Sequence, residues 1–356
     1  MSAKISVAIV GLDNWYHAFP FADILAKHER AILKAVSDHD SVRINWIKSR
    51  YRVPVYADYE AIISDPSIDA VIITACTGRH KELIEMAVAE GKHVLCDKPL
   101  DTTVEKCDSI LRAVTKASTV FCMSFPRRVR PLYIEAKKLI SEGAIGRPLC
   151  ITETGKYRLP SKAPGMSDPG WYIKKEHSGG GGFIDHAVHQ IDMLRWWLEE
   201  EVQWVDCKIK NLAFKDLEVE DYGVATMEFK NGVIATIESS WISHGPVSDV
   251  IEVQGTRGRI KIDVGAGTID VNSPNMPSHG LRRTFVPSSF VEVCGHKIPV
   301  DGYAALFENF IACVMGEAEP AARVEDGWAA TAVVAAAYEA AKAPNVAVPQ
   351  LRSGLY

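Results

Sequence analysis

The stretch VAIVGLDNWYHAF, residues 7–19, begins as a buried β-strand and then departs from the pattern that usually follows such a strand. Its apolar run ends at Gly11, and a helical segment follows. In the dinucleotide fingerprint, three glycines make the tight turn, admit the pyrophosphate and let the helix pack on the strand. Here only the first is present, because Asp13 and Tyr16 stand at the other two positions. The loop alone is weak evidence for a dinucleotide, and a turn that serves packing only is the alternative.

Strand-like and helix-like segments alternate through the first 125 residues. Continuous apolar strands separated by amphipathic helices are typical of a parallel sheet covered on both faces. We therefore predict an N-terminal Rossmann domain, a doubly wound α/β sheet, over residues 1–125. The predicted strands are 5–10, 31–38, 68–75, 91–99 and 119–125, with a short one in VPVYAD, and the predicted helices are 17–29, 41–51, 79–90 and 103–117.

The pattern changes after residue 125. A helix at 131–142 precedes a loop rich in glycine, proline and serine at 159–182, and a second helix covers 184–198. From Val202 onward, segments of period 2 follow one another, divided by turns such as Asn231-Gly232. We predict a C-terminal α+β domain over residues 126–356, with an antiparallel sheet packed on one face and terminal helices free to pack back on the first domain.

Composition excludes several classes of function. The chain has 356 residues, 47% of them hydrophobic, and a net charge of −5. Because it contains no run of Lys and Arg, we expect no nucleic-acid partner. No apolar stretch approaches the ~20 residues of a membrane span, and the N-terminus lacks the anatomy of a signal peptide. Eight cysteines without a CxxC pair suit a reducing compartment, so we expect a cytoplasmic protein that does not contact membranes.

Asp38 is a second sign of a dinucleotide. It ends the strand AILKAVSD, where an acid accepts hydrogen bonds from an adenosine ribose. Such a carboxylate favours NAD over NADP because it repels a 2′-phosphate, although His39 and Arg43 lie nearby. The alternative is that the strand ends in Asp for turn chemistry.

Two further stretches carry chemistry. In CDKPL, residues 96–100, Pro99 fixes the chain beyond Lys98 at the carboxyl edge of the sheet. A lysine there can donate to a substrate oxygen or relay a proton, unless it is merely a solvated residue at a strand end.

In GGGGFIDHAVHQIDMLRWW, residues 179–197, Asp185 and His189 lie four residues apart on one helix. A histidine near a carboxylate suits acid–base work near neutral pH. The alternative is an exposed pair that contributes little to the stability of the helix. Asp185, His186 and His189 could also bind a metal, but such histidine spacing is frequent without one, and we expect none.

Together these motifs resemble the glucose–fructose oxidoreductase, inositol dehydrogenase and rhizopine-catabolism family (Gfo/Idh/MocA). ITACTGRH (73–80), IGRP (145–148) and the alanine-rich segment 325–349 also resemble family segments, so the likeness covers nearly the whole chain. The resemblance implies NAD(P)-dependent hydride transfer at a hydroxyl-bearing carbon of a sugar, sugar derivative or cyclitol. It assigns catalysis to Lys98, Asp185 and His189. It also implies a large, open, mostly antiparallel C-terminal sheet through which the chain forms a homodimer or homotetramer.

The resemblance also assigns binding residues. Arg128, Tyr157 and Trp171 are candidate substrate contacts, with a purely structural strand residue as the alternative for Tyr157. The expected cofactor-binding residues are Gly11, Leu12, Asn14, Trp15, Asp38, Thr77, His80, Asp97 and Lys98.

The chain departs from the family at four places. Asp13 and Tyr16 replace glycines, Asp97 replaces the glutamate of EKP, Ala187 replaces a glycine, and Cys76-Thr77 replace Pro-Asn. Two rival functions therefore stay open. One is a glycoside-cleaving enzyme that uses tightly bound NAD transiently. The other is an inactive homologue that serves as a sensor or scaffold.

Overall fold

The computed structural model describes residues 4–274, 281–286, 290–293, 296–299 and 301–343. Its first part is a six-stranded parallel sheet in the order β3-β2-β1-β4-β5-β6, which confirms the Rossmann fold. The strands are β1 (Ile5–Val10), β2 (Ala31–Ser37), β3 (Val55–Tyr56), β4 (Ala70–Ile73), β5 (His93–Cys96) and β6 (Phe121–Met123). The helices are α1 (Trp15–Leu25), α2 (Ser41–Arg50), α3 (Tyr59–Ile63), α4 (His80–Ala89) and α5 (Val104–Lys116), with the 3₁₀ turn η1 at Thr77–Arg79.

The apolar strand runs explain this sheet. Val7, Ala8, Ile9 and Val10 of β1 are all fully buried, because β1 lies at the centre with β2 and β4 on its two sides. Helices cover both faces, so no side of the strand can carry a polar residue. The parallel order brings the carboxyl ends of β1, β4 and β5 to one edge of the sheet.

The second part is an eight-stranded sheet in the order β14-β13-β12-β11-β7-β10-β9-β8, antiparallel except for β10 beside β7. Its strands are β7 (Pro148–Lys156), β8 (Val202–Lys210), β9 (Tyr222–Phe229), β10 (Ile234–Ser240), β11 (Ser248–Gly255), β12 (Gly258–Asp263), β13 (Thr268–Asn272) and β14 (Leu281–Phe285). A hairpin of β15 (Phe290–Val293) and β16 (His296–Pro299) is separate. The helical segments are η2 (Pro126–Val129), α6 (Pro131–Ser141), η3 (Gly170–Ile173), α7 (Lys175–Ser178), α8 (Gly182–Leu198), α9 (Asp301–Val314) and α10 (Val324–Ala340).

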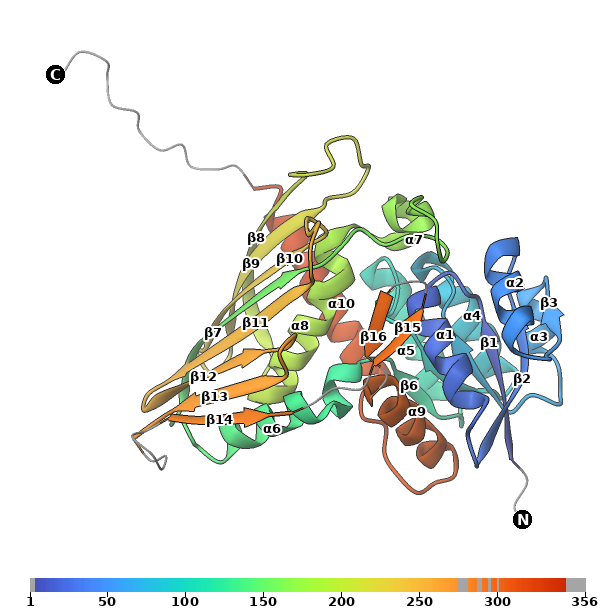
Figure 1. The fold of residues 1–356 in the computed structure, drawn as a ribbon, viewed down its shortest axis with the longest axis horizontal. Coiled ribbons are helices and arrows are strands. Elements are labelled where there is room, and N and C mark those ends of the chain that lie inside the picture. The colour runs from blue at the N-terminus through green and yellow to red at the C-terminus, as the bar shows by residue number, and fades with distance from the viewer. Residues whose placement is uncertain (1–3, 275–280, 287–289, 294–295, 300, 344–356) are drawn as a thin grey trace.

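Alternate residues of the large sheet face in opposite directions. In β9, Gly223, Ala225, Met227 and Phe229 are buried, while the residues between them are half-exposed. The buried face packs against α8 and α10, which lie between the sheet and the Rossmann domain (Figure 1). This is the predicted antiparallel sheet with one packed face, and it places α8 next to the carboxyl edge of the first sheet.

Helix α9 lies against the first domain. Phe307 and Phe310 share an apolar cluster with Phe19 and Phe21 of α1. The amide of Met123 in β6 donates to the carbonyl oxygen of Ala322 at 2.9 Å. The last part of the described chain therefore holds the two sheets together. None of the helices in the described ranges has the length and hydropathy that a membrane span requires.

Gly11 is the one fingerprint glycine that the fold demands. Its φ is +76°, and a Cβ there would lie 2.5 Å from the Cα of Ala75 in the loop after β4. We predict that Gly11→Ala lowers the free energy of unfolding by ~1–2 kcal/mol for the left-handed backbone and by ~1–3 kcal/mol more for the overlap.

Gly232→Ala is the matched control, because Gly232 has a φ of +81° and no atom near the position of a Cβ. It should show only the backbone cost in a denaturant titration. Equal losses in the two variants would contradict the steric argument.

Candidate active site

The start of α8 is fixed by close backbone contacts. A Cβ on Gly181 or Gly182 would lie 1.9 Å or 2.7 Å from the carbonyl oxygens of Glu220 and Asp221. The Glu220 carboxylate accepts the amides of Gly181 and Phe183 at 2.8 and 3.1 Å. These bonds satisfy free amides of the first helical turn, so the segment before β9 sets the position of Asp185.

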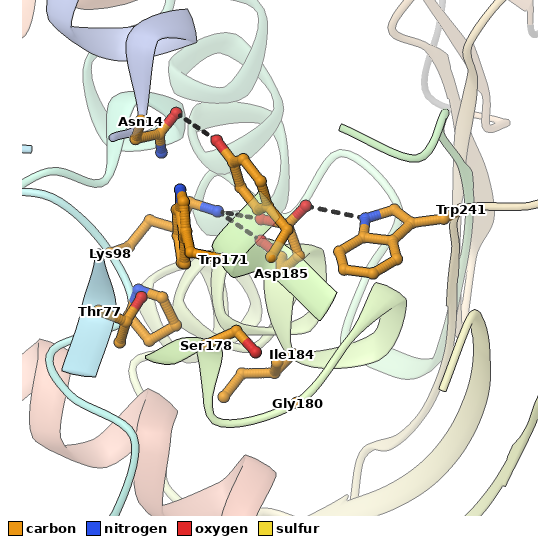
Figure 2. Close-up of a pocket in the computed structure, with 11 residues that line it drawn as sticks. Asn14, Thr77, Lys98, Trp171, Ser178, Gly180, Ile184, Asp185 and Trp241 are labelled. Carbon is orange, nitrogen blue, oxygen red and sulfur yellow. Dashed lines mark hydrogen bonds and ion pairs between the residues drawn. The ribbon is translucent and has the colours of Figure 1, made fainter. Parts of the chain in front are cut away.

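Lys98 and Asp185 meet across the two domains (Figure 2). Lys98 Nζ lies 2.6 Å from Asp185 Oδ1 and donates to the Asp185 carbonyl oxygen at 2.7 Å. The Lys98 side chain is 4% exposed and that of Asp185 is 16% exposed. Burial alone would raise the pKa of Asp185, but the neighbouring Lys98 and His186 lower it well below its usual value. The aspartate is therefore ionised and bound to an ammonium group.

The second oxygen of Asp185 has two further neighbours. Trp241 Nε1 donates to Oδ2 at 3.0 Å, and His186 Nε2 lies 3.3 Å from the same atom. No ion pair joins Asp185 to His189 among the described side chains. The reason is that both carboxylate oxygens are already taken by Lys98, Trp241 and His186.

His189 lies at the same site with different surroundings. Its Nδ1 is buried without a hydrogen-bond partner, and its ring meets Phe125 edge to face, with the ring centroids 5.9 Å apart. Burial, with Lys98 and Arg127 adding to it, lowers the pKa of His189 well below its ordinary value. The imidazole is therefore neutral at neutral pH, and Nε2 is the nitrogen available to a ligand.

A cavity of about 820 Å³ opens between the two domains beside these residues; we call it the interdomain cavity. Its size suits a small organic ligand. Residues from both domains line it, among them His17, Lys98, Tyr157, Asp185, His186 and His189. The structure thus brings the three predicted catalytic residues to one cavity.

The three predicted substrate contacts lie in different surroundings. Tyr157 lines the interdomain cavity with its ring, but its hydroxyl donates to Asp249 at 2.9 Å. Trp171 lies outside that cavity, beside Lys98 in a narrow second pocket (Figure 2).

Arg128, the third predicted substrate contact, is bound to other side chains in this structure. Its guanidinium binds Asp192 and Asp326, each at 2.7 Å, and it is absent from the cavity lining. The neighbouring Arg127 lies nearer the site, where it binds Asp249 at 3.0 Å and Glu153 at 2.6 Å. Nothing in the sequence distinguishes the two adjacent arginines.

Charged side chains are bonded to one another beside the glycine turn. Asp38 is fully buried, and its carboxylate accepts the amides of Leu12 and Asp40, each at 2.6 Å. Arg43 binds the same carboxylate through Nε at 3.1 Å and Nη2 at 2.9 Å, and Nη2 also reaches Asp13 at 2.9 Å. Asp13 therefore points toward Arg43 and toward the amide of Cys76, which donates to its Oδ2 at 3.0 Å.

Residues 159–173, which we call the covering segment, lie over this turn. Trp15 Nε1 donates to the Ser161 carbonyl at 2.8 Å, and the Ser161 amide donates to the Tyr16 hydroxyl at 3.1 Å. Trp171 Nε1 donates to the Asp13 carbonyl at 3.1 Å. The two residues that replace fingerprint glycines, Asp13 and Tyr16, thus both bind the covering segment.

The remaining predicted cofactor residues are also enclosed. Asp97 is held by Asn14 Nδ2 at 2.6 Å and by His17 Nδ1 at 2.8 Å, a partner that the sequence analysis missed. The ring nitrogens of His80 lie 2.9 and 3.0 Å from the carbonyl oxygens of Pro99 and Ala75, so this side chain braces the loop. Thr77 is buried and lines the narrow pocket with Lys98.

The chemical types of these residues suit the binding of a dinucleotide. They supply a strand-end glycine with positive φ, an acid after β2 and a lysine after β5. The covering segment contacts the same turn through Ser161 and Trp171. No cluster of His, Cys, Asp or Glu suited to a metal occurs in the part of the chain that the structure describes.

The two neutral imidazoles predict how stability depends on pH. Burial lowers the pKa of His186 to about 3, while a histidine in the unfolded chain has a pKa of ~6.5. Between these values the unfolded state binds more protons, so stability falls as the solution is acidified. From about pH 7 to about pH 5, each such histidine should remove about 2 kcal/mol from the free energy of unfolding.

Over that pH range, the free energy of unfolding of His186→Gln should therefore fall by about 2 kcal/mol less than that of the parent protein. Denaturant titrations at several pH values measure this difference. Above about pH 8 the two proteins should show parallel curves, because the imidazole is neutral in both states there. Parallel curves between pH 7 and 5 would contradict the assignment.

Comparisons with known proteins agree with this geometry. Residues 5–125 match the oxidoreductase family with an NAD-binding Rossmann fold, and residues 133–261 match the GFO/IDH/MocA C-terminal domain. Inositol 2-dehydrogenase of Rhizobium meliloti is 30% identical over 86% of this chain and 88% of that protein. The scyllo-inositol 2-dehydrogenase (NAD(+)) of Bacillus subtilis is 30% identical over 74% of this chain and 75% of that protein. The chain is also similar to the crystal structure of a probable dehydrogenase from Thermotoga maritima, with 28% sequence identity and a TM-score of 0.76. This match covers 95% of this chain and 97% of the other. The chain therefore belongs to the Gfo/Idh/MocA family of oxidoreductases, as its motifs predicted.

Proposed function

We propose that this protein is an NAD(P)-dependent dehydrogenase or reductase that acts on a CH–OH group of a cyclitol, sugar or sugar derivative. The observation that carries the proposal is the buried contact of Lys98 with Asp185 beside the interdomain cavity, 2.6 Å between Nζ and Oδ1. Similarity to two inositol dehydrogenases supports a polyol substrate. A bound nicotinamide would accept or supply the hydride.

The chain's own residues would handle the proton and the oxygen. Neutral His189 takes the hydroxyl proton on Nε2, since its Nδ1 is enclosed. The Lys98 ammonium stabilises the substrate oxygen while that oxygen becomes a carbonyl. Asp185 keeps Lys98 in place, because the two side chains are bound to each other in a largely dry site. Water is excluded by Trp241 and by Tyr172 of the covering segment, both of which line the narrow pocket.

The choice of cofactor follows from the turn. Asp38 favours NAD, because a carboxylate at this position repels a 2′-phosphate. In this structure Arg43 neutralises Asp38, which weakens that repulsion. We keep NAD as the proposed cofactor because the turn carries two acids, Asp13 and Asp38, for one arginine.

The test combines a substrate panel with variants. Purified protein is given cyclitols, aldoses and glycosides with NAD or NADP, and reduced cofactor is measured by absorbance. We expect oxidation of at least one cyclitol or aldose, with kcat lowered by about 10²–10⁴-fold in Lys98→Met and in His189→Asn. Lys27→Met, at an exposed position after α1, is the matched control.

Two results would overturn the proposal. Glycoside cleavage without net reduction of added cofactor would favour transient use of bound NAD. No thermal shift with NADH or NADPH would favour the inactive scaffold.

The open face of the large sheet supports self-association. Trp204 is 51% exposed and Ile234 is 38% exposed. Glu228 of β9 lies between them in register, so all three share the face that turns away from α8. We propose that this face joins two or four copies of the chain. Light scattering should show a dimer or tetramer that Trp204→Glu weakens, and a monomer at all concentrations would contradict the proposal.

A further inference from the structure

His186 presents one ring nitrogen to the interdomain cavity. Its side chain is 20% exposed, and it lines the cavity together with Lys98 and His189. Nε2 lies 3.3 Å from Asp185 Oδ2. Nδ1 has no protein partner among the described residues, yet it is not among the enclosed unpartnered atoms. The ring therefore points one nitrogen into the protein and the other toward a ligand.

The ring is held rigidly by a stack. Tyr157 lies parallel to it, with the ring centroids 3.5 Å apart and the planes at 16°. The Tyr157 hydroxyl donates to Asp249 at 2.9 Å, and Arg127 binds the same carboxylate oxygen at 3.0 Å. At Gly155 a Cβ would lie 2.7 Å from the Tyr157 ring, so a glycine makes room for this stack.

The partner of Nε2 determines which nitrogen carries the proton. Asp185 is ionised beside Lys98, and an ionised carboxylate only accepts hydrogen bonds. A lone pair on Nε2 would be repelled by the ionised oxygen 3.3 Å away, whereas a proton there is attracted to it, so we assign the proton to Nε2 and the lone pair to Nδ1. The charged and titratable groups that face the ring are Asp185, Lys98, Arg127 and His17, and burial above all, with Lys98 and Arg127 adding to it, lowers the pKa of His186 and keeps the ring neutral.

We propose that His186 is a specificity-determining residue whose Nδ1 accepts a hydrogen bond from the substrate hydroxyl next to the one that is oxidised. This inference rests on the proposed function, in which Lys98 faces the reacting oxygen. Lys98 binds one oxygen of the Asp185 carboxylate and His186 Nε2 lies 3.3 Å from the other, so the two side chains stand side by side as neighbouring hydroxyls of one polyol do. The site would thus select vicinal diols over isolated alcohols.

The proposal predicts a loss of discrimination in a variant. The probes are trans-1,2-cyclohexanediol and cyclohexanol, which differ only in the neighbouring hydroxyl. In the parent protein the kcat/KM for the diol should exceed that for the alcohol by about two- to tenfold, since one hydrogen bond contributes ~0.5–1.5 kcal/mol net. His186→Phe should reduce this ratio to near unity. His177→Phe, an exposed histidine on α7, should leave it unchanged.

A binding measurement on the free enzyme gives a second readout. Nitrogen-15 NMR of labelled histidines, assigned with His186→Phe, reports each imidazole nitrogen separately. The diol should shift the Nδ1 resonance of His186, and cyclohexanol should not. If His186→Phe does not fold, His186→Asn serves both for assignment and for the kinetic ratio.

The outcomes separate the two proposals. An unchanged ratio in the variant, or an Nδ1 resonance that the diol leaves in place, would overturn the role of His186 while the enzyme still oxidises polyols. A parent protein that oxidises no alcohol with NAD or NADP would overturn the proposed function. The NMR titration would then still decide whether His186 binds a diol.

Discussion

The ion pair of Lys98 and Asp185 is the interaction on which the site depends. It ties the loop after β5 of one sheet to the first turn of α8 beneath the other, with 2.6 Å between the charged atoms. Breaking such a buried pair leaves an uncompensated charge, which costs ~3–5 kcal/mol, so neither partner can leave alone. The pair therefore joins the two domains at the edge of the interdomain cavity, next to His186 and His189.

The altered glycine turn has a physical explanation in the covering segment. A glycine at position 13 or 16 offers neither a carboxylate nor a hydroxyl, whereas Asp13 binds Arg43 and Tyr16 binds Ser161. Arg43 adds a bond from Nη1 to the Lys162 carbonyl at 2.9 Å. The turn has thus gained side chains that hold protein where the family's glycines leave backbone open. Where three glycines keep the backbone of such a turn open to phosphates, side chains of this turn bind another segment of the same chain.

Local pattern was sufficient for the fold, and for the residues that a strand end or a helix turn places. Buried strands alternating with helices predicted the parallel sheet, and the position of Lys98 after β5 predicted its place at the carboxyl edge. Contacts between distant segments were beyond such reasoning. Which side chain lies next to Asp185 depends on how α8 is rotated against β5. The sequence paired Asp185 with His189, but the neighbour in the structure is His186, about one helical turn earlier. The bond between Arg43 and Asp38 was equally unpredictable, because the two residues are five apart and helical spacing does not determine where the Arg43 side chain points.

The cover and the catalytic lysine are joined by one buried chain of hydrogen bonds. Tyr172 donates to Asn14 Oδ1 at 3.1 Å, Asn14 Nδ2 donates to Asp97 Oδ2 at 2.6 Å, and the Lys98 amide donates to Asp97 Oδ1 at 2.8 Å. Because these groups are buried, an unpaired member costs more than it would in water. Loss of the Tyr172 hydroxyl would leave Asn14 Oδ1 without this donor, on the same side chain whose amide nitrogen holds Asp97. The covering segment is therefore linked through Asn14 to the residue that positions Lys98, so the order of the cover and the placement of the lysine depend on the same buried bonds.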